Sequence, residues 1–94
     1  MNHKGSILIV DDELNMCRIL QEILETEHYK VRTANDGIKA LLLLKEEPSD
    51  ILISDLRMPK MDGMELLREV KTLYPEMEVV LMSAYATVES AVEA

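Results

Sequence analysis

The chain has 94 residues, a formal net charge of −8 and a hydrophobic content of 48%. This length accommodates one domain with a single hydrophobic core. Nucleic-acid binding depends on lysine and arginine side chains that neutralise phosphates, so the acidity argues against direct contact with DNA or RNA. No apolar stretch reaches the length of a membrane-spanning helix or of a signal-peptide core. We therefore expect a cytoplasmic protein that makes no membrane contact.

Strand and helix patterns alternate along the chain. Short apolar runs rich in branched residues predict strands at 7–10, 29–34, 50–54 and 79–82. Apolar residues at helical spacing predict helices between these strands, over 14–27, 38–45 and 62–73. Thr87 is a suitable N-cap for a fourth helix that is still in progress at Ala94.

The order of these elements predicts one α/β domain over residues 1–94. Strands that alternate with helices through short connections form parallel sheets with right-handed crossovers and helices on both faces. Strand 29–34 alternates polar and apolar residues, which is typical of a sheet edge. The other three strands are continuously apolar, so we expect them inside the sheet.

Several residues carry local structural signals. His28 stands at the end of the first predicted helix, where the backbone is often left-handed, a conformation that histidine tolerates better than most residues. The segment Asn35-Asp36-Gly37 is expected to cap the helix predicted over 38–45, and Asp62 forms a capping-box pattern with Glu65 at the start of the next helix. Cys17, the single cysteine, falls within an amphipathic helical pattern and is expected to be a small buried side chain.

Three methionines and one glycine follow the third predicted strand closely. We expect Met58, Met61 and Met64 to anchor the loop and the next helix to the core, because methionine fills irregular apolar gaps. We expect Gly63 to permit close packing at the start of that helix.

Three aspartates follow two of the predicted strands. Asp11 and Asp12 come directly after strand 7–10, and Asp55 comes directly after strand 50–54. The carboxyl ends of the strands in an open α/β sheet line one crevice, so these carboxylates are expected to converge. Clustered carboxylates suit Mg²⁺, which prefers oxygen ligands. The alternative, in which each aspartate only caps a helix, leaves the doublet unexplained because one helix needs one cap.

Four motifs together resemble the receiver domain of two-component response regulators. They are Val-Asp-Asp-Glu at 10–13, Asp-Gly at 36–37, Ser-Asp-Leu-Arg-Met-Pro-Lys-Met-Asp-Gly at 54–63 and Met-Ser-Ala at 82–84. The resemblance implies an open, parallel, flavodoxin-like α/β sheet with strand order 2-1-3-4. Receivers normally have five strands and five helices. By that pattern the domain is truncated in the fourth helix, and the fifth strand, the fifth helix and the lysine beside the phosphate are missing.

The resemblance also implies a role for each residue of the site. Asp55 would accept a phosphoryl group from the phosphohistidine of a sensor histidine kinase. Asp12, Asp55 and the backbone carbonyl of Arg57 would bind Mg²⁺ directly, with Asp11 acting through water. The hydroxyl of Ser83 would donate a hydrogen bond to the phosphoryl oxygens and draw its loop inward, although an ordinary turn serine is the alternative.

The output of such a switch is suggested by two further segments. Asp-Leu-Arg-Met-Pro at 55–59 and the ending Ser-Ala-Tyr-Ala-Thr-Val-Glu-Ser-Ala-Val-Glu-Ala look most like receivers of nitrogen-regulator-type transcription activators. In those proteins an ATPase domain and a DNA-binding domain follow. The resemblance thus implies regulation of transcription through an output domain, with no nucleic-acid contact by this segment itself.

Two other functions compete with a phosphorylated switch. A phosphatase of the haloacid dehalogenase type also uses an aspartate nucleophile, but it needs Asp-x-Asp where this chain has Asp11-Asp12-Glu13. We therefore do not expect an enzyme that turns over a separate substrate. A receiver-like interaction module that works without phosphorylation remains the second alternative.

The final prediction from the sequence concerns self-association. If the chain ends at Ala94, strand 79–82 becomes a sheet edge with no proline or charge to blunt it, and such edges pair with other chains. We expect a homodimer or larger assembly of marginal stability. Sedimentation and thermal melts would compare it with a chain extended by roughly 25–30 residues to ordinary domain length. A monomer that melts as cooperatively as the longer chain would contradict this.

Overall fold

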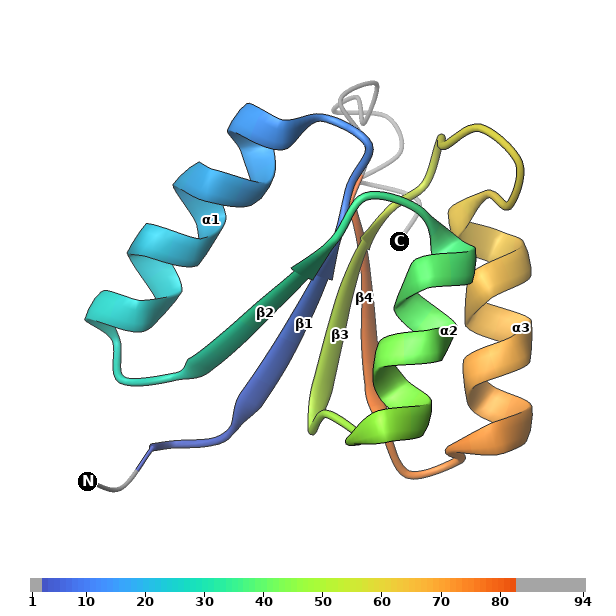
Figure 1. Ribbon diagram of the computed structural model, residues 1–94. Helices are drawn as coiled ribbons and strands as arrows, with labels where there is room; N and C mark the ends of the chain where they lie inside the picture. Colours follow the sequence, from blue (N-terminus) through green and yellow to red (C-terminus); the bar gives the residue numbers. More distant parts are fainter. Residues whose placement is uncertain (1–2, 83–94) are drawn as a thin grey trace, which may run out of the picture.

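The computed structural model describes residues 3–82, in which four strands alternate with three helices (Figure 1). The elements are β1 (Ser6–Val10), α1 (Leu14–Thr26), β2 (Lys30–Ala34), α2 (Gly37–Glu46), β3 (Ile51–Asp55), α3 (Gly63–Leu73) and β4 (Glu78–Met82). Each predicted strand and each of the first three predicted helices is confirmed to within one or two residues at its ends. The helix predicted after Thr87 lies outside the described residues.

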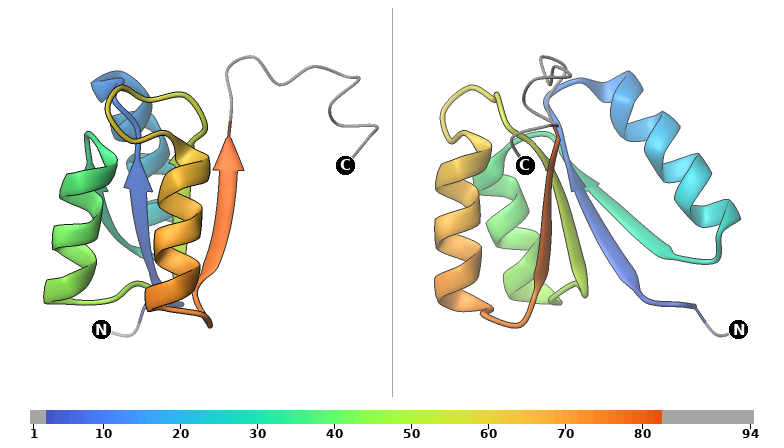
Figure 2. Two further views of the ribbon diagram at one scale, coloured as in Figure 1. Left: turned by 90° about the vertical axis from the view of Figure 1, so that its right-hand side faces the viewer. Right: turned by 180° about the vertical axis from the view of Figure 1, so that it is seen from behind.

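The strands form one parallel sheet in the order β2-β1-β3-β4. α1 lies on one face of the sheet, and α2 and α3 lie side by side on the other (Figure 1 and Figure 2). The α/β class, the parallel pairing, the 2-1-3-4 order and the edge position of the second strand are therefore confirmed. Within residues 3–82, no helix is long and apolar enough to cross a membrane.

The strict alternation of side chains along β1 divides the core in two. Leu8 and Val10 join the larger cluster between the sheet and the α2 and α3 helices. Ile7 and Ile9 join a smaller cluster beneath α1. All four are essentially inaccessible to solvent. A strand covered on both faces must be apolar at every position, which explains the continuous run at 7–10.

β4 lies next to β3 and is the outer strand among residues 3–82, as the predicted order 2-1-3-4 requires. The expectation of an inner position, drawn from its apolar sequence, stays a prediction because the residues after Met82 lie outside the described part of the chain. Val80, which pairs with Ile53 in the register, is 49% exposed. α1 packs on β1 and β2 and does not cover this part of the sheet (Figure 2).

The local signals read from the sequence are confirmed where α1, α2 and α3 begin or end. His28 has a φ of 71°, the left-handed backbone expected after the first helix. The Asp36 carboxylate accepts a hydrogen bond from the Lys39 backbone N–H at 2.7 Å. Asp62 accepts one from the Glu65 backbone N–H at 2.9 Å. Each aspartate thus satisfies a backbone donor in the first turn of its helix.

The three methionines expected to anchor the loop divide into two groups. Met58 is buried in the larger core cluster, and Met61 packs against that cluster while partly exposed. Met64 is 41% exposed, so the prediction that it anchors α3 to the core is wrong. Its position in the first turn of α3 turns it away from Leu66 and Val70, which are the buried residues of that helix.

Arg32 connects β2 to the end of α2 through side-chain hydrogen bonds. Its guanidinium donates to the backbone oxygen of Leu43 at 3.1 Å, to the backbone oxygen of Glu47, and to the hydroxyl of buried Ser49 at 2.9 Å. The last carbonyls of a helix lack partners within the helix, and here a charged fork supplies them. This explains a cation in the middle of a strand.

We predict that Arg32→Met lowers the free energy of unfolding by about 1–3 kcal/mol, because hydrogen bonds to charged groups carry about that much. Urea unfolding would measure the loss. The matched control is Lys30→Met in the same strand. Lys30 pairs with Glu47 at 3.4 Å with both side chains half exposed, and such a pair contributes roughly 0–1 kcal/mol. Equal losses in the two variants would contradict the assignment.

Candidate functional site

The three aspartates singled out in the sequence meet at the carboxyl edge of the sheet. Asp11 and Asp12 follow β1 directly, and Asp55 is the last residue of β3. β1 pairs with β3 in register, with Val10 opposite Ser54, so the residues after them emerge side by side. One carboxylate oxygen from each aspartate lies within 4.8 Å of the others. The predicted convergence is therefore confirmed.

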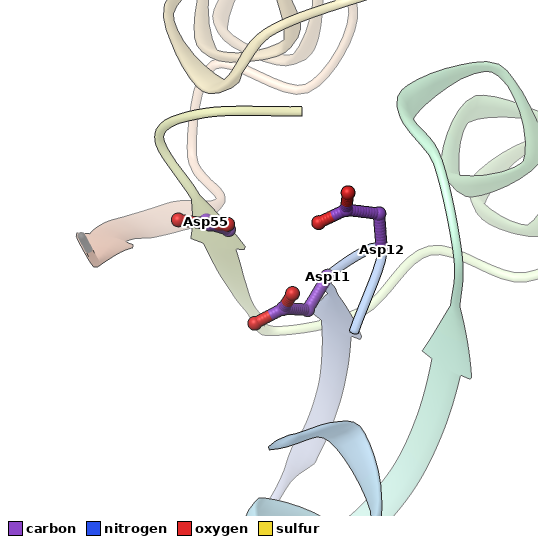
Figure 3. A group of neighbouring side chains, drawn as sticks. All are labelled: Asp11, Asp12 and Asp55. Carbon is purple, nitrogen blue, oxygen red and sulfur yellow. The ribbon is translucent and has the colours of Figure 1, made fainter. Parts of the chain in front are cut away.

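Burial differs across the three side chains. Asp11 is buried at 5% relative exposure, Asp55 is intermediate and Asp12 is exposed. Asp11 and Asp12 extend from the end of β1 toward the side where Asp55 lies (Figure 3). The cluster thus has a buried floor and an open side, through which an ion or a phosphoryl donor could reach Asp55.

Asp11 also makes a hydrogen bond at the start of α1, as the alternative of a helix cap predicted. Its carboxylate accepts a hydrogen bond from the backbone N–H of Glu13 at 2.9 Å. Glu13 is the N-cap residue of α1, but its own side chain makes no capping hydrogen bond. Asp11 therefore shapes the turn into α1, whereas Asp12 extends into the acidic cluster.

The electrostatics of the cluster are unfavourable without a cation. Burial raises the pKa of Asp11 above its ordinary value, and the nearby charges of Asp55, Asp12 and Glu13 raise it further. The hydrogen bond from the Glu13 backbone opposes this rise in pKa but does not cancel it. A bound divalent cation would offset the repulsion between the carboxylates.

The donor set fits Mg²⁺. Three carboxylates offer hard oxygen ligands, and the exposed side leaves room for water, which Mg²⁺ usually retains when proteins bind it. Arg57, whose backbone carbonyl the family pattern adds to this set, lies two residues after Asp55 in the β3–α3 loop. The roles of Arg57 and of the aspartates as ligands stay predictions. Ser83 lies outside the described residues.

A close backbone approach fixes the loop that follows Asp55. The Gly63 backbone N–H donates to the Leu56 carbonyl at 2.9 Å. A Cβ atom on Gly63 would lie 2.5 Å from the backbone oxygen of Asp55 and 2.9 Å from the Cα of Leu56. These distances are too short for any side chain, so the predicted close packing at Gly63 is confirmed. The start of α3 is thereby held directly against the end of β3.

Two features of the site were missed by reasoning from the sequence. Lys60, in the β3–α3 loop, has a φ of 71°, a backbone conformation that is uncommon for a residue with a side chain. Cys17 is buried as predicted, but its thiol also donates to the backbone oxygen of Asp11 at 3.4 Å. Burial raises the pKa of this thiol, and the neighbouring Asp11 raises it further, so it stays a neutral donor. No local sequence pattern marks either feature.

Comparisons with known proteins agree with this fold. A family model described as the response regulator receiver domain matches residues 7–94. The transcriptional regulatory protein ZraR of Escherichia coli (strain K12) is 46% identical over 95 residues, which cover 100% of this chain and 22% of ZraR. The crystal structure of NtrX from Brucella abortus matches 95% of this chain and 20% of its own with a TM-score of 0.85 and 33% identity. The N-terminal domain of a receiver protein from Methanoculleus marisnigri JR1 matches 96% of this chain and 76% of its own, with a TM-score of 0.82 and 32% identity.

A parallel 2-1-3-4 sheet with an aspartate cluster at its carboxyl edge defines a receiver-type signalling module. The chain belongs to the response regulator receiver domain family. This confirms the family inferred from the motifs and places the chain in two-component signalling. The chain spans about a fifth of the length of the curated relatives it matches.

We predict that Asp11→Asn stabilises the metal-free protein at pH 7, raising the melting temperature by a few degrees. Because the pKa of Asp11 is higher in the folded state than in the unfolded chain, the folded state binds the proton more tightly. The wild type therefore loses stability as the pH rises between the two pKa values, whereas asparagine does not titrate and keeps an oxygen for the Glu13 backbone. The difference should vanish below the unfolded-chain pKa of 3.8.

Thermal melts from pH 3 to pH 8 in a chelating buffer would measure this difference. Glu22→Gln is the matched control, since it removes one negative charge from the exposed side of α1, away from the cluster. An equal gain in the control would attribute the effect to the net charge of the chain. A less stable Asp11→Asn at pH 7 would contradict the prediction outright.

Proposed function

We propose that the chain is a phospho-accepting signalling switch in which Asp55 receives a phosphoryl group from a sensor histidine kinase with the help of Mg²⁺. The observation that carries the proposal is the carboxylate cluster at the ends of β1 and β3, with oxygens within 4.8 Å of one another. Membership of the receiver family supports the same function. The proposal extends to a conformational change that regulates an output.

In this mechanism an oxygen of the Asp55 carboxylate attacks the phosphorus of phosphohistidine. The new P–O bond makes an acyl phosphate as the P–N bond to the histidine breaks, and the imidazole leaves with the bonding electrons. A carboxylate oxygen attacks without first giving up a proton, so an aspartate nucleophile needs no general base. Its partial exposure leaves the nucleophile accessible, while Asp11 is buried beside it.

Asp12 and Asp55, with the carbonyl of Arg57, are proposed to hold Mg²⁺, and Asp11 to act through water. Bound Mg²⁺ would neutralise negative charge on the oxygens of the phosphoryl group during its transfer. Ser83 is the proposed donor to these oxygens once they are in place. The chain would then act as a switch that controls its own phosphorylation state and not as an enzyme that turns over a separate substrate.

The partners and the setting of the switch are also proposals. The curated relatives are about five times longer than this chain, and ZraR is called a transcriptional regulatory protein. We propose a parent protein in the cytoplasm, with an ATPase and a DNA-binding output, that works as a homodimer. An interaction module that works without phosphorylation is the alternative. The intact acid cluster favours the switch, because docking alone does not require three converging carboxylates.

We predict that acetyl phosphate labels the full receiver at Asp55 alone and that the label requires Mg²⁺. Intact-mass and peptide mass spectrometry would locate the added phosphoryl group. Asp55→Asn should abolish labelling because the nucleophile is lost. Asp12→Ala should lower the affinity for Mg²⁺ by at least about tenfold, since even residues that only support metal ligands contribute 10–100-fold.

Asp62→Asn is the matched control for these two variants. It removes a carboxylate from the same loop region, and asparagine still caps α3. Its labelling should equal that of the wild type. A label on Asp11 or Asp12, labelling that survives Asp55→Asn, or an unchanged Mg²⁺ affinity in Asp12→Ala would refute the proposed site. A folded, unlabelled wild type would favour the interaction module.

A further inference from the structure

A second glycine, Gly37, makes a contact that its backbone conformation does not explain. Gly37 is the buried first residue of α2, and no glycine among residues 3–82 has a positive φ. A Cβ atom at this position would lie 2.9 Å from Sδ of Met61, 3.1 Å from its Cγ and 3.2 Å from its Cβ. All three distances are shorter than ordinary van der Waals contacts. The glycine is therefore needed for space, which Met61 occupies.

Met61 belongs to the loop that begins directly after Asp55. Its backbone N–H donates to the Pro59 carbonyl at 2.8 Å, and the residue before it, Lys60, is held in the left-handed conformation. Its side chain also packs on the larger core cluster. The loop is thus a tight turn, and Met61 is the residue through which it touches the start of α2.

The two ends that flank this contact are fixed independently. The Asp36 carboxylate caps α2 through the Lys39 backbone N–H, and Ala40 is completely buried one turn later. On the loop side, the backbone of Gly63 is packed directly against the carbonyl of Asp55. A displacement of Met61 must therefore be taken up between residues 56 and 60, which is the segment beside Asp55 that carries the Arg57 carbonyl.

We propose that Gly37 and Met61 form a positioning pair that sets the distance of the β3–α3 loop from the acid cluster and thereby tunes the Mg²⁺ site. The inference rests on the proposed function for its metal. Neither residue touches the metal or the phosphoryl group. They act through the backbone of the loop, because Sδ and Cγ of Met61, the two atoms nearest the added Cβ, are packed on the larger core cluster and pass the crowding to the Met61 backbone.

The positioning role predicts a different outcome for Gly37→Ala from the outcome that a purely structural role predicts. Within a helix, alanine is a better helix former than glycine. Gly37→Ala should therefore change the stability of the domain little, because the gain in α2 compensates the crowding at Met61. The effect on the metal site should be large by comparison, since a misplacement of about 1 Å at a reacting group can cost about a hundredfold.

The test is a double-mutant cycle in the full receiver domain, with Gly37→Ala, Met61→Ala and the double variant. Gly37→Ala should raise the Mg²⁺ dissociation constant about tenfold, the lower limit for supporting residues of metal sites, with a melting temperature close to that of the wild type. Met61→Ala removes Sδ and Cγ, the two atoms nearest the new Cβ. In that background the added alanine should have little effect on Mg²⁺ binding.

Gly5→Ala is the matched control. A Cβ there meets a single side chain, the Asp50 carboxylate at 3.1 Å, at the opposite end of β1. It should leave Mg²⁺ binding unchanged. The inference is overturned if Gly37→Ala binds Mg²⁺ as the wild type does, or if its effect is the same with alanine at position 61.

Backbone amide shifts of residues 56–60, recorded by NMR without metal, separate this inference from the proposed function. They should move in Gly37→Ala and return in the double variant whether or not Mg²⁺ binds. A wild type that fails to bind Mg²⁺ while these shifts behave as expected would refute the metal site and retain the contact. Unmoved shifts in Gly37→Ala would refute the positioning pair even where Mg²⁺ binds normally.

Discussion

The direct pairing of β1 with β3 is the constraint on which the site depends. Parallel strands in register end at the same edge of the sheet, so the residues after Val10 and Ser54 have to meet. Here those residues are carboxylates, and one of them is almost completely buried. The apolar packing of β1 on both faces holds the like charges together against their repulsion. The domain therefore carries a built-in electrostatic cost, which a cation at this edge would relieve.

Contacts on either side of the cluster restrict the positions that its three aspartates can take. On the β1 side, the Asp11 carboxylate binds the Glu13 backbone, and the Cys17 thiol binds the Asp11 backbone. On the β3 side, Gly63 brings the start of α3 against the Asp55 carbonyl. The Cys17 and Gly63 contacts use backbone atoms of the aspartates and do not occupy their carboxylates.

The features that the sequence predicted correctly are those decided by nearby residues. His28, Asp36 and Asp62 act within one helical turn, and the three aspartates follow from which residues end the strands. The features it missed depend on residues far apart in the chain. Periodicity does not reveal that Met64 faces solvent. The contact of Gly37 with Met61 joins segments 24 positions apart, and only the folded chain brings them together.

The same packing indicates how an event at Asp55 would reach the rest of the domain. The backbone N–H of Leu56, the next residue, donates to the Met82 carbonyl at 2.6 Å and so ties the acceptor loop to the end of β4. A ligand can shift a conformational equilibrium only through contacts that differ between the two states. Charge added at Asp55 changes the repulsion within the cluster, and this hydrogen bond and the Gly63 contact connect that change to β4 and to α3. The acid cluster thus lies where the ends of β1 and β3, the end of β4 and the start of α3 come together, an arrangement that suits the proposed switch.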